Sequence, residues 1–442
     1  MNGTTNVNTD KQGTLELTVE APAHGGHFVA RHEGRVVFVR HALPGERVRA
    51  RLTDGGPDAK FWRADTVEVL EPADGRREHF WAEADALRAA AEGRLPVGGA
   101  EFGHIDLAEQ RRLKARIFEE QLARLAGMDR AVEVEPALAE APDGLGWRTR
   151  VSFSVTPEGK LAMHPHRSEA LVPVEEMPLA VPAVNALNLW KTDFTGVERV
   201  EVAAPAAGDD PLVLLIPAAG TRAARLSRIA ADLPGTCSVA AWEPDTHRLT
   251  RLRGRTWVRE EAAGHHYRVT GAGFWQIHRT APQTLVGAVL EGLQPEPGER
   301  AADLYAGAGL FTGPLAAAVG PGGSVLSVEG SPGTSRDARK NLFDQPQVDI
   351  VQGRVDRVLG RDRRALDLVL LDPPRAGAGK QVIAQIDAAA PRAVGYVSCD
   401  PASFARDLGY LRRSGWELRA LRVFDLYPHT HHMESFAVLT RG

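Results

Sequence analysis

The stretch Ala301-Ala302-Asp303-Leu304-Tyr305-Ala306-Gly307-Ala308-Gly309 decides the fold. Its first half is a short, largely apolar run, which is typical of a strand in the core of a domain. Its second half contains two glycines, which let the backbone turn tightly and approach a ligand closely. A strand that leads directly into such a loop predicts an open α/β sheet with a ligand site at its carboxyl edge.

Strand-like and helical segments alternate from about His266 to the end of the chain, which predicts a parallel sheet with crossover helices. Besides 301–305, the strand-like segments are 324–328, 348–351, 366–371, 393–397, 418–424 and 435–439. Seven such segments resemble the sheet of a class I methyltransferase, which has a Rossmann-like α/β fold. We therefore expect this fold class for residues 266–442.

Two acidic residues end strands of this predicted sheet. Glu329 follows the second strand and is placed to accept hydrogen bonds from ribose hydroxyls. The glycine after Gly309 is Gly313, one position later than the dinucleotide G-x-G-x-x-G pattern requires, which argues against a nicotinamide enzyme. The fourth strand ends in Asp372-Pro373-Pro374-Arg375, where consecutive prolines keep the chain extended. We expect Asp372 to face the same crevice as Glu329; a chance strand-terminating turn is the alternative.

Cys399 follows the strand 393–397, in Val397-Ser398-Cys399-Asp400-Pro401. Free cysteine is among the most buried residue types, so its default interpretation is a small core residue. Its position after the glycine loop and Asp372, each at a strand end, favours a nucleophile instead. The only other cysteine is Cys237, and two cysteines build neither a disulfide framework nor a four-thiolate metal site. This cysteine usage fits a reducing cytoplasm.

Short alternating segments broken by Gly and Pro fill the region from about Leu15 to Leu70 and predict a small β-barrel. The expected strands are 15–19, 35–39, 47–52 and 62–67. The region resembles a TRAM domain, an OB-like RNA-binding barrel, through the turn at Gly34, the strand 36–39 and the turn 43–46. A generic barrel without an RNA role is the alternative.

The middle of the chain is predicted to be an α+β domain. Residues 107–125 have the apolar spacing of an amphipathic helix. In the expected strand 147–155, Arg148 and Arg150 fall on one face, a spacing suited to contacts with phosphates. Two basic runs, 111–116 and 248–255, belong either to an RNA-binding face or to an ordinary solvated surface.

Composition sets broad limits. A length of 442 residues suggests two to four domains, and a net charge of −4 excludes a protein that is basic overall. No apolar run approaches the length of a membrane span, so we expect no membrane association. The polar residues 1–10 lack the apolar core of a signal peptide, and we expect a cytoplasmic protein.

Taken together, the chain resembles the RNA uracil-C5 methyltransferase family, whose members often join a TRAM domain to a domain that binds S-adenosylmethionine. The motifs that carry the resemblance are Gly273–His278, Asp303–Gly309, Asp372–Arg375, Ser398–Pro401 and Pro428–Glu434. The resemblance implies three domains: a TRAM-like barrel (11–72), a central RNA-binding domain (73–265) and a methyltransferase domain (266–442). Its implied substrate is a uridine of tRNA or rRNA.

The resemblance also implies roles for individual residues. Those implied around the methyl donor and the target base are Gln276, Tyr305, Gly307, Glu329 and Asp372. Cys399 is implied as the nucleophile and Glu434 as the base. This chemistry suits uracil, because a thiolate that adds at C6 makes C5 nucleophilic, and a carboxylate can then remove the C5 proton. In folded RNA the base must also leave its stack to reach such a pocket.

The chain departs from the family in three places. Residues 97–105 contain no cysteine, whereas many members hold an iron–sulfur cluster there, so we expect no such cluster. Leu310 stands where Asn is frequent, and Arg354 where an acidic residue is common near the adenine. The histidines of 429–432 together with Glu434 could suggest a metal site, but the family pattern accounts for this segment and we expect no metal.

Two other functions remain open from the sequence. An RNA cytosine-C5 methyltransferase is one alternative, because the same thiolate addition activates both bases. A catalytically inactive RNA-binding protein is the other, given the missing cluster and Leu310.

Overall fold

The computed structural model describes residues 13–56, 58–362 and 364–441. The polar segment 1–10 and the first two residues of the predicted barrel domain lie outside the described residues. The chain divides into two compact units. The first contains the chain up to Ile117 with Met163–Val172 and Tyr427–His432, and the second contains Phe118–Ala162, Pro173–Leu426 and the chain from Met433. The division into three domains with boundaries near 72 and 265 stays a prediction.

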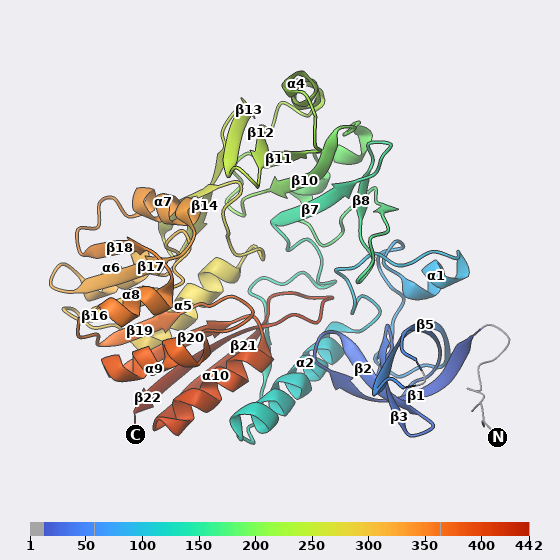
Figure 1. Ribbon diagram of the computed structural model, residues 1–442, viewed down its shortest axis with the longest axis horizontal. Coiled ribbons are helices and arrows are strands. Elements are labelled where there is room, and N and C mark those ends of the chain that lie inside the picture. Colours follow the sequence, from blue (N-terminus) through green and yellow to red (C-terminus); the bar gives the residue numbers. More distant parts are fainter. Residues whose placement is uncertain (1–12, 57, 363, 442) are drawn as a thin grey trace. The chain divides into compact units, whose positions relative to one another are not determined.

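A closed five-stranded barrel with the strand order β1-β2-β3-β5-β4 begins the first unit (Figure 1). The strands are β1 (Thr14–Ala23), β2 (His27–His32), β3 (Arg35–Arg40), β4 (Arg47–Asp54) and β5 (Phe61–Glu71). Alternate side chains such as Leu15, Leu17 and Val37 are at most 2% exposed and fill the interior. The predicted barrel is therefore confirmed, and β2 is the strand that was missed.

Two helices follow the barrel in sequence. They are α1 (Ala86–Ala91) and α2 (Leu107–Gln121). The helix predicted over 107–125 continues beyond α2 as one turn of π-helix, η1 (Leu122–Ala126). Gly127 ends this turn with φ = 60°, a left-handed conformation that glycine adopts without steric cost.

A seven-stranded sheet with the order β13-β12-β11-β10-β7-β8-β9 forms the middle of the chain. Its strands are β7 (Arg150–Val155), β8 (Leu161–Met163), β9 (Val172–Pro173), β10 (Val197–Ala203), β11 (Leu212–Pro217), β12 (Ser238–Glu243) and β13 (Arg248–Arg253). The accompanying helices are α3 (Pro182–Asn185), the 3₁₀ turn η2 (Leu189–Lys191) and α4 (Ala223–Asp232). A hairpin of β14 (Trp257–Ala262) and β15 (His265–Thr270) follows.

The C-terminal part forms an eight-stranded sheet with the order β18-β17-β16-β19-β20-β22-β21-β6. Its strands are β16 (Arg300–Leu304), β17 (Ser324–Glu329), β18 (Val348–Gln352), β19 (Leu368–Leu371), β20 (Ala393–Ser398), β21 (Trp416–Asp425), β22 (Glu434–Arg441) and the short β6 (Val134–Pro136). All seven predicted strands are confirmed, and β6 adds an unpredicted eighth that runs parallel to β21.

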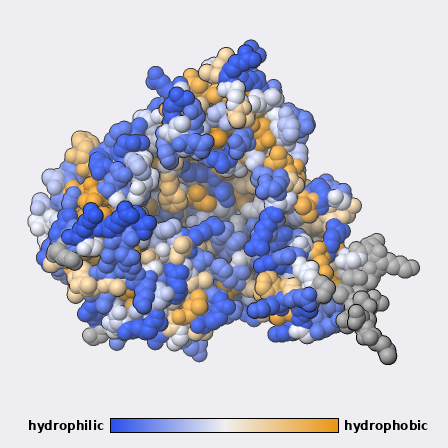
Figure 2. All heavy atoms as spheres, viewed as in Figure 1, coloured by the Kyte–Doolittle hydropathy of each residue, from blue (hydrophilic) through white to orange (hydrophobic). Residues whose placement is uncertain are grey.

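Helices cover both faces of this sheet (Figure 1). They are α5 (Ala281–Leu293), α6 (Thr312–Val319), α7 (Pro332–Asn341), α8 (Val355–Arg361), α9 (Gly379–Ala389) and α10 (Pro401–Arg413). Helices α8, α9 and α10 pack next to one another, and the surface above them is mostly hydrophilic (Figure 2). Across the described part of the chain, every helix is too short or too polar to span a bilayer.

Candidate active site

The carboxyl ends of four parallel strands, β16, β17, β19 and β20, meet at one edge of the C-terminal sheet. In their register, Leu304 pairs with both Val328 and Leu371. The residues that leave these strands at the same edge are Tyr305, Glu329, Asp372 and Cys399. The structure thus brings together the strand-end residues that the sequence singled out, at the edge where α/β sheets bind ligands.

Cys399 and Glu434 face each other because of the pairing between β20 and β22. These strands run antiparallel, and their last pair is Ser398 with Ser435. The next positions in the same register are Cys399, directly after β20, and Glu434, the first residue of β22. Residues opposite each other in an antiparallel pair have Cβ atoms about 4.5–5.5 Å apart where the pairing continues. A thiol and a carboxylate distant in sequence therefore lie side by side.

The thiol of Cys399 is held in its neutral form. Burial, together with the negative charges of Glu434 and Asp372, raises the pKa of Cys399 to about 12. Arg375 acts in the opposite direction and favours the thiolate. Because this pKa lies far above neutrality, Cys399 needs a nearby base to form a thiolate at neutral pH.

Asp372 shares a partly buried, polar environment with Gln276. Gln276 is 5% exposed, and its Nε2 donates a hydrogen bond of 3.5 Å to Asp372 Oδ2. Burial raises the pKa of Asp372 to about 7, with a further contribution from the charge of Asp303. Asp303 is itself fully buried, and its Oδ2 accepts a 2.5 Å hydrogen bond from Thr312 Oγ1. Such raised pKa values in a crevice are typical of functional sites.

The glycine loop is tied to the next strand by Glu329. Its carboxylate accepts hydrogen bonds from the backbone N–H groups of Gly307 at 2.8 Å and Ser331 at 2.5 Å. Tyr305 opens the loop with φ = 65°, a strained conformation for a residue with a side chain. Gly309 follows at φ = 93°, and a Cβ there would lie 2.9 Å from Leu342 Cδ1. The loop shape thus depends on Gly309, while the predicted contact between Glu329 and a ribose stays a prediction.

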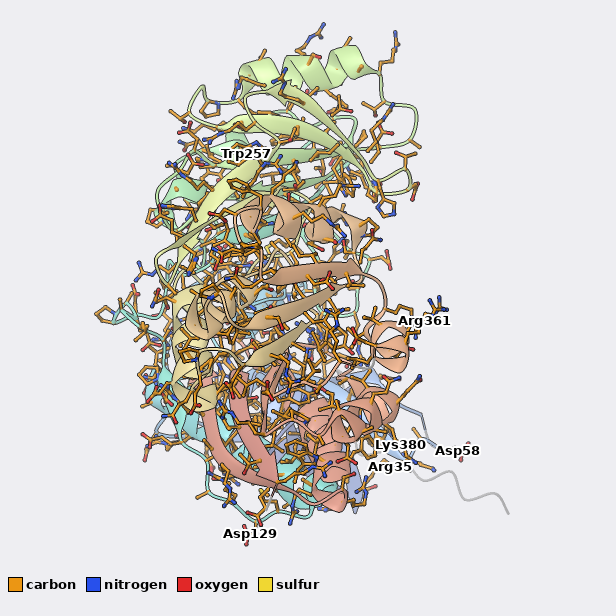
Figure 3. The ribbon with its side chains drawn as sticks, turned by 90° about the vertical axis from the view of Figure 1, so that its left-hand side faces the viewer. Arg35, Asp58, Asp129, Trp257, Arg361 and Lys380 are labelled. Carbon is orange, nitrogen blue, oxygen red and sulfur yellow. The ribbon has the colours of Figure 1, made fainter. Side chains whose placement is uncertain are left out.

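A pocket of about 410 Å³ opens beside this loop. Its lining residues are Tyr305, Gly330, Gly353, Arg354, Val355, Asp356 and 378–382. The guanidinium of Arg354 forms two hydrogen bonds to Asp356, at 3.0 and 2.9 Å. Lys380 and, at the end of α8, Arg361 reach the outer surface (Figure 3). Sequence reasoning noticed Arg354 but missed Asp356, the carboxylate that partly neutralises it.

Asp407 on α10 anchors the glycine-rich segment after Asp372, and sequence reasoning missed it. This fully buried carboxylate accepts hydrogen bonds from Ala378 N at 2.7 Å, Gly379 N at 3.1 Å and the Tyr396 hydroxyl at 2.8 Å. Gly377 approaches it so closely that a Cβ there would lie 2.6 Å from Asp407 Oδ2. One side chain on the neighbouring helix therefore fixes a wall of the pocket.

Arg150 has a structural contact that the sequence did not suggest. Its Nη1 donates to the carbonyl oxygens of Gly271 at 3.2 Å and Gly273 at 2.8 Å. Those residues begin the loop that carries Gln276 to Asp372. Arg150 therefore holds this loop in place. This contact accounts for an arginine at position 150 without any contact to a phosphate.

Each of the two basic runs has one cation that is turned toward the protein. Lys114 is 0% exposed and donates to the carbonyl oxygen of Tyr427 at 3.1 Å. Arg253 donates to the carbonyl oxygens of Ala230 at 2.7 Å and Leu233 at 3.0 Å. Lys114 and Arg253 thus satisfy backbone carbonyl groups, those of Arg253 at the end of α4, while Arg112, Arg116, Arg248 and Arg251 are exposed.

The histidine-rich segment lies in the first unit. His429 is 0% exposed, its backbone N–H donates to Gln110 Oε1 at 2.7 Å, and its imidazole contacts Gln110 Nε2 at 3.1 Å. His431 lies 3.7 Å from Glu101. Within the described ranges, no three His, Cys, Asp or Glu side chains are grouped so as to hold a metal ion.

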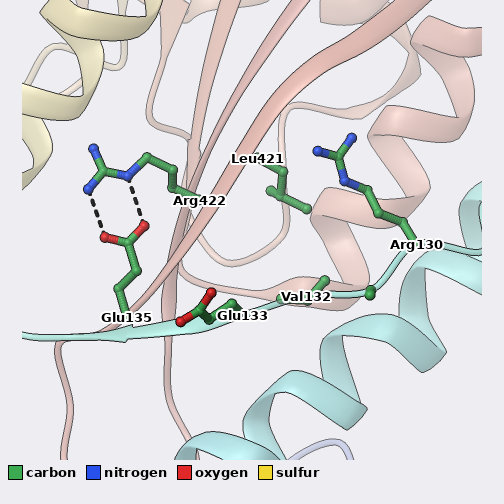
Figure 4. A pocket seen from close by; sticks show the side chains of 7 residues that line it. Arg130, Val132, Glu133, Glu135, Leu421 and Arg422 are labelled. Atoms are coloured by element: carbon green, nitrogen blue, oxygen red, sulfur yellow. Dashed lines mark hydrogen bonds and ion pairs between the residues drawn. The ribbon is translucent and has the colours of Figure 1, made fainter.

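A separate pocket of about 460 Å³ lies at the β6 edge of the sheet (Figure 4). Arg422 and Glu135 form a two-bond ion pair there, with bonds of 2.8 and 2.7 Å, and Arg130 extends on the opposite side of Leu421. This ion pair joins the added strand β6 to β21 and therefore has a structural role.

Comparison with known proteins supports the predicted family. The TRAM domain family matches residues 12–61, and the tRNA (Uracil-5-)-methyltransferase family matches residues 354–442. A Streptomyces avermitilis protein described as an uncharacterized RNA methyltransferase is 43% identical over 96% of this chain and 97% of its own length. A 23S rRNA (uracil(1939)-C(5))-methyltransferase of Thiobacillus denitrificans is 33% identical, covering 95% of this chain and 98% of its own.

Among solved structures, the Pyrococcus abyssi tRNA (uracil-54, C5)-methyltransferase in complex with S-adenosyl-L-homocysteine superposes with a TM-score of 0.70. The match covers 96% of this chain and 99% of that one, at 18% identity, and shows the shared fold. The predicted class I methyltransferase fold is therefore confirmed. With the two family matches and the full-length relatives, the chain belongs to the RNA uracil-C5 methyltransferase family and is a methyltransferase dependent on S-adenosylmethionine.

Proposed function

We propose that the protein methylates C5 of a uridine in tRNA or rRNA through a covalent bond between Cys399 and uracil C6. The observation that carries this proposal is the strand register that sets Cys399 opposite Glu434 at the carboxyl edge of the sheet. A nucleophile and a proton acceptor on adjacent strands can act in turn on neighbouring atoms of one base.

The reaction follows from this arrangement. The thiolate of Cys399 adds to C6, and the C5=C6 electron pair moves toward the C4 carbonyl oxygen as an enolate. C5 then attacks the methyl carbon of S-adenosylmethionine, so that a C5–CH₃ bond forms, the sulfonium S–CH₃ bond breaks and S-adenosylhomocysteine leaves. Glu434 accepts the C5 proton, the C5=C6 double bond reforms, and Cys399 is released as thiolate.

Cys399 needs a base, because burial and two nearby carboxylates raise its pKa to about 12. Asp372 is a candidate, since its pKa is raised to about 7 and its charge acts directly on the sulfur. A carboxylate with such a pKa is partly ionised at neutral pH and suited to proton transfer. Gln276 orients it by donating to Oδ2 at 3.5 Å.

The methyl donor fits the pocket of about 410 Å³ next to the glycine loop. Tyr305 offers an aromatic face there, and Asp356 and Arg354 offer polar groups to an adenosine. Glu329 at the end of β17 holds Gly307 of the glycine loop, where a ribose would approach. When bound, the donor supplies an electrophilic methyl group next to the edge that carries Cys399.

Asp407→Ala is expected to weaken binding of S-adenosylhomocysteine about tenfold and to lower the free energy of unfolding by about 3 kcal/mol. The substitution leaves Ala378 N, Gly379 N and the Tyr396 hydroxyl without their shared acceptor, and the first two residues line the pocket. Titration calorimetry and urea unfolding measure the two effects.

Asp387→Ala is the matched control for this prediction. Asp387 also sits in the helical layer, on α9, where it accepts from Trp416 Nε1 at 2.9 Å and from Arg441 at 2.7 Å, but it does not line the pocket. We expect this variant to lose stability and to keep its affinity for S-adenosylhomocysteine. Unchanged affinity in Asp407→Ala would contradict the role of the anchored segment.

The proposed function is tested by incubating the protein with labelled S-adenosylmethionine and total tRNA or rRNA, then identifying and mapping the methylated nucleoside. We expect 5-methyluridine at a defined position. Finding 5-methylcytidine would support a cytosine-specific enzyme, and binding of RNA without any methylation would support an inactive protein; either result rejects the proposal.

A further inference from the structure

A second pocket lies within the first unit, against the wall of the barrel, and has a volume of about 430 Å³. Its barrel residues are His27 of β2, Phe38 and Arg40 of β3, Thr53 and Asp54 of β4, and 63–65 of β5. Two segments outside the barrel, 95–96 and 165–168, complete it. Its size falls within the range of about 300–1,000 Å³ that small-molecule sites occupy.

The barrel pocket contains a nearly buried ion pair, Arg40 with Asp65, and an exposed cation, Arg167. Arg40 donates to Asp65 through two bonds of 2.8 and 2.6 Å, with both side chains nearly buried. Arg63 pairs with Asp54 at 2.6 Å. Arg167 is exposed and has no ion-pair or hydrogen-bond partner among the residues that the structure places. With three arginines and two aspartates, the pocket has a positive excess that suits an anionic group.

Aromatic rings form the walls of the pocket. The ring of His27 meets Phe38 at 6.2 Å and 78°, and meets His166 at 5.9 Å and 74°. Burial and the neighbouring arginines lower the pKa of His27 to about 4 and also lower that of His166, which favours the neutral form of both rings. His166 Nε2 is buried without a hydrogen-bond partner in the described structure. A neutral aromatic face with an unused ring nitrogen is suited to a nucleobase.

The pocket segment 165–168 contains a strained backbone conformation. Arg167 has φ = 53°, which is costly for a residue with a side chain and is maintained only where the surroundings impose it. Gly98 N donates to His164 O at 3.0 Å, and Val97 pairs with Pro165, so the segment is fixed to its neighbours on the side of Pro96. The aromatic ring and the free guanidinium are therefore presented together by an ordered loop.

We propose that the barrel pocket binds one unpaired nucleotide of the substrate RNA, with its base against His166 and His27 and its phosphate on Arg167 and Arg63. The proposal rests on the proposed function for the identity of the ligand as RNA. Unpaired bases are recognised by stacking on aromatic side chains, while arginines contact phosphates, and both elements occur here in one pocket. An acidic peptide would use the cations but leave the aromatic walls and the His166 ring nitrogen without a role.

Binding of a fluorescein-labelled single-stranded RNA decamer, measured by anisotropy over a range of salt concentrations, tests the pocket. His166→Ala is expected to bind about tenfold more weakly, because it removes a stacking face. Arg167→Ala is expected to reduce the slope of log affinity against log salt by about 0.7, the value for one phosphate contact with a single strand. Arg51→Ala is the control, since Arg51 is an exposed arginine on β4 of the same barrel and does not line the pocket.

Three results would overturn the proposal: wild-type affinity in both pocket variants, an equal loss in Arg51→Ala, or equal competition by polyglutamate of the same charge, which would indicate attraction of anions alone.

Methyl transfer on the mapped RNA separates this proposal from the proposed function. We expect the pocket variants to raise KM for RNA and to keep kcat. If the wild-type protein methylates RNA while the pocket variants bind normally, only the pocket proposal fails; if methylation is absent while the variants lose RNA binding, only the proposed function fails.

Discussion

Cys399→Ala is expected to reduce methyl transfer at least about 10³-fold while leaving the affinity for S-adenosylhomocysteine unchanged. The substitution removes the atom that adds to C6, and without this addition C5 of uracil is too weak a nucleophile to take the methyl group. Cys399 does not line the donor pocket, so donor binding is a separate readout. Single-turnover transfer of labelled methyl groups and calorimetric titration measure the two quantities.

The chain offers a matched control in its only other cysteine. Cys237 is 4% exposed, its Sγ donates to the carbonyl oxygen of Pro234 at 3.2 Å, and burial raises its pKa. Cys237→Ala is expected to keep full activity and to cost about 1 kcal/mol of stability. Retained turnover in Cys399→Ala, or an equal loss in Cys237→Ala, would reject Cys399 as the nucleophile.

The positions of Tyr305, Glu329, Asp372 and Cys399 could be predicted because each lies at the end of an apolar strand or directly after it. In a parallel sheet, strand order alone brings such residues to one edge, so no side-chain detail is required. Glu434 was placed by the family motif, and the pairing of Ser398 with Ser435 now gives the physical reason for its position. The catalytic roles themselves stay predictions.

Asp407 and Asp356 could not be predicted, because they act across elements distant in sequence. Asp407 lies on α10 and binds backbone N–H groups near α9, a contact that depends on how two helices pack. Strand β6 was missed for a different reason. β6 contains only Val134–Pro136, and a proline within so short a run argues against a strand unless it lies at a sheet edge, as it does here.

Charge runs were the least informative part of the sequence. The run 248–255 contains four arginines, but the guanidinium of Arg253 caps the carbonyl oxygens of Ala230 and Leu233. Arg255 pairs with Asp209 at 2.7 Å. A sequence shows how many cations a segment has but not which way they point, and long side chains often satisfy backbone groups of their own unit.

Glu434→Gln is expected to trap a covalent complex of the protein with methylated RNA and to lower turnover about 10²- to 10⁴-fold. Glutamine has nearly the same shape but cannot accept the C5 proton, so the C5=C6 bond does not reform and Cys399 is not expelled. Glu434 is only 2% exposed and begins β22, so the isosteric replacement is needed to preserve the strand. The complex is measured as a labelled band that survives denaturing electrophoresis.

The double variant Cys399→Ala with Glu434→Gln shows whether the trapped bond is the expected one. Because Cys399 supplies the only thiol at this edge of the sheet among the described residues, the double variant should form no adduct with the same RNA. The label in the adduct must come from the donor methyl group, since proton removal follows methyl transfer. An adduct that persists in the double variant would place the covalent bond elsewhere. A Glu434→Gln protein that turns over normally would show that another group, such as the carboxylate of Asp372 beside the same sulfur, removes the C5 proton.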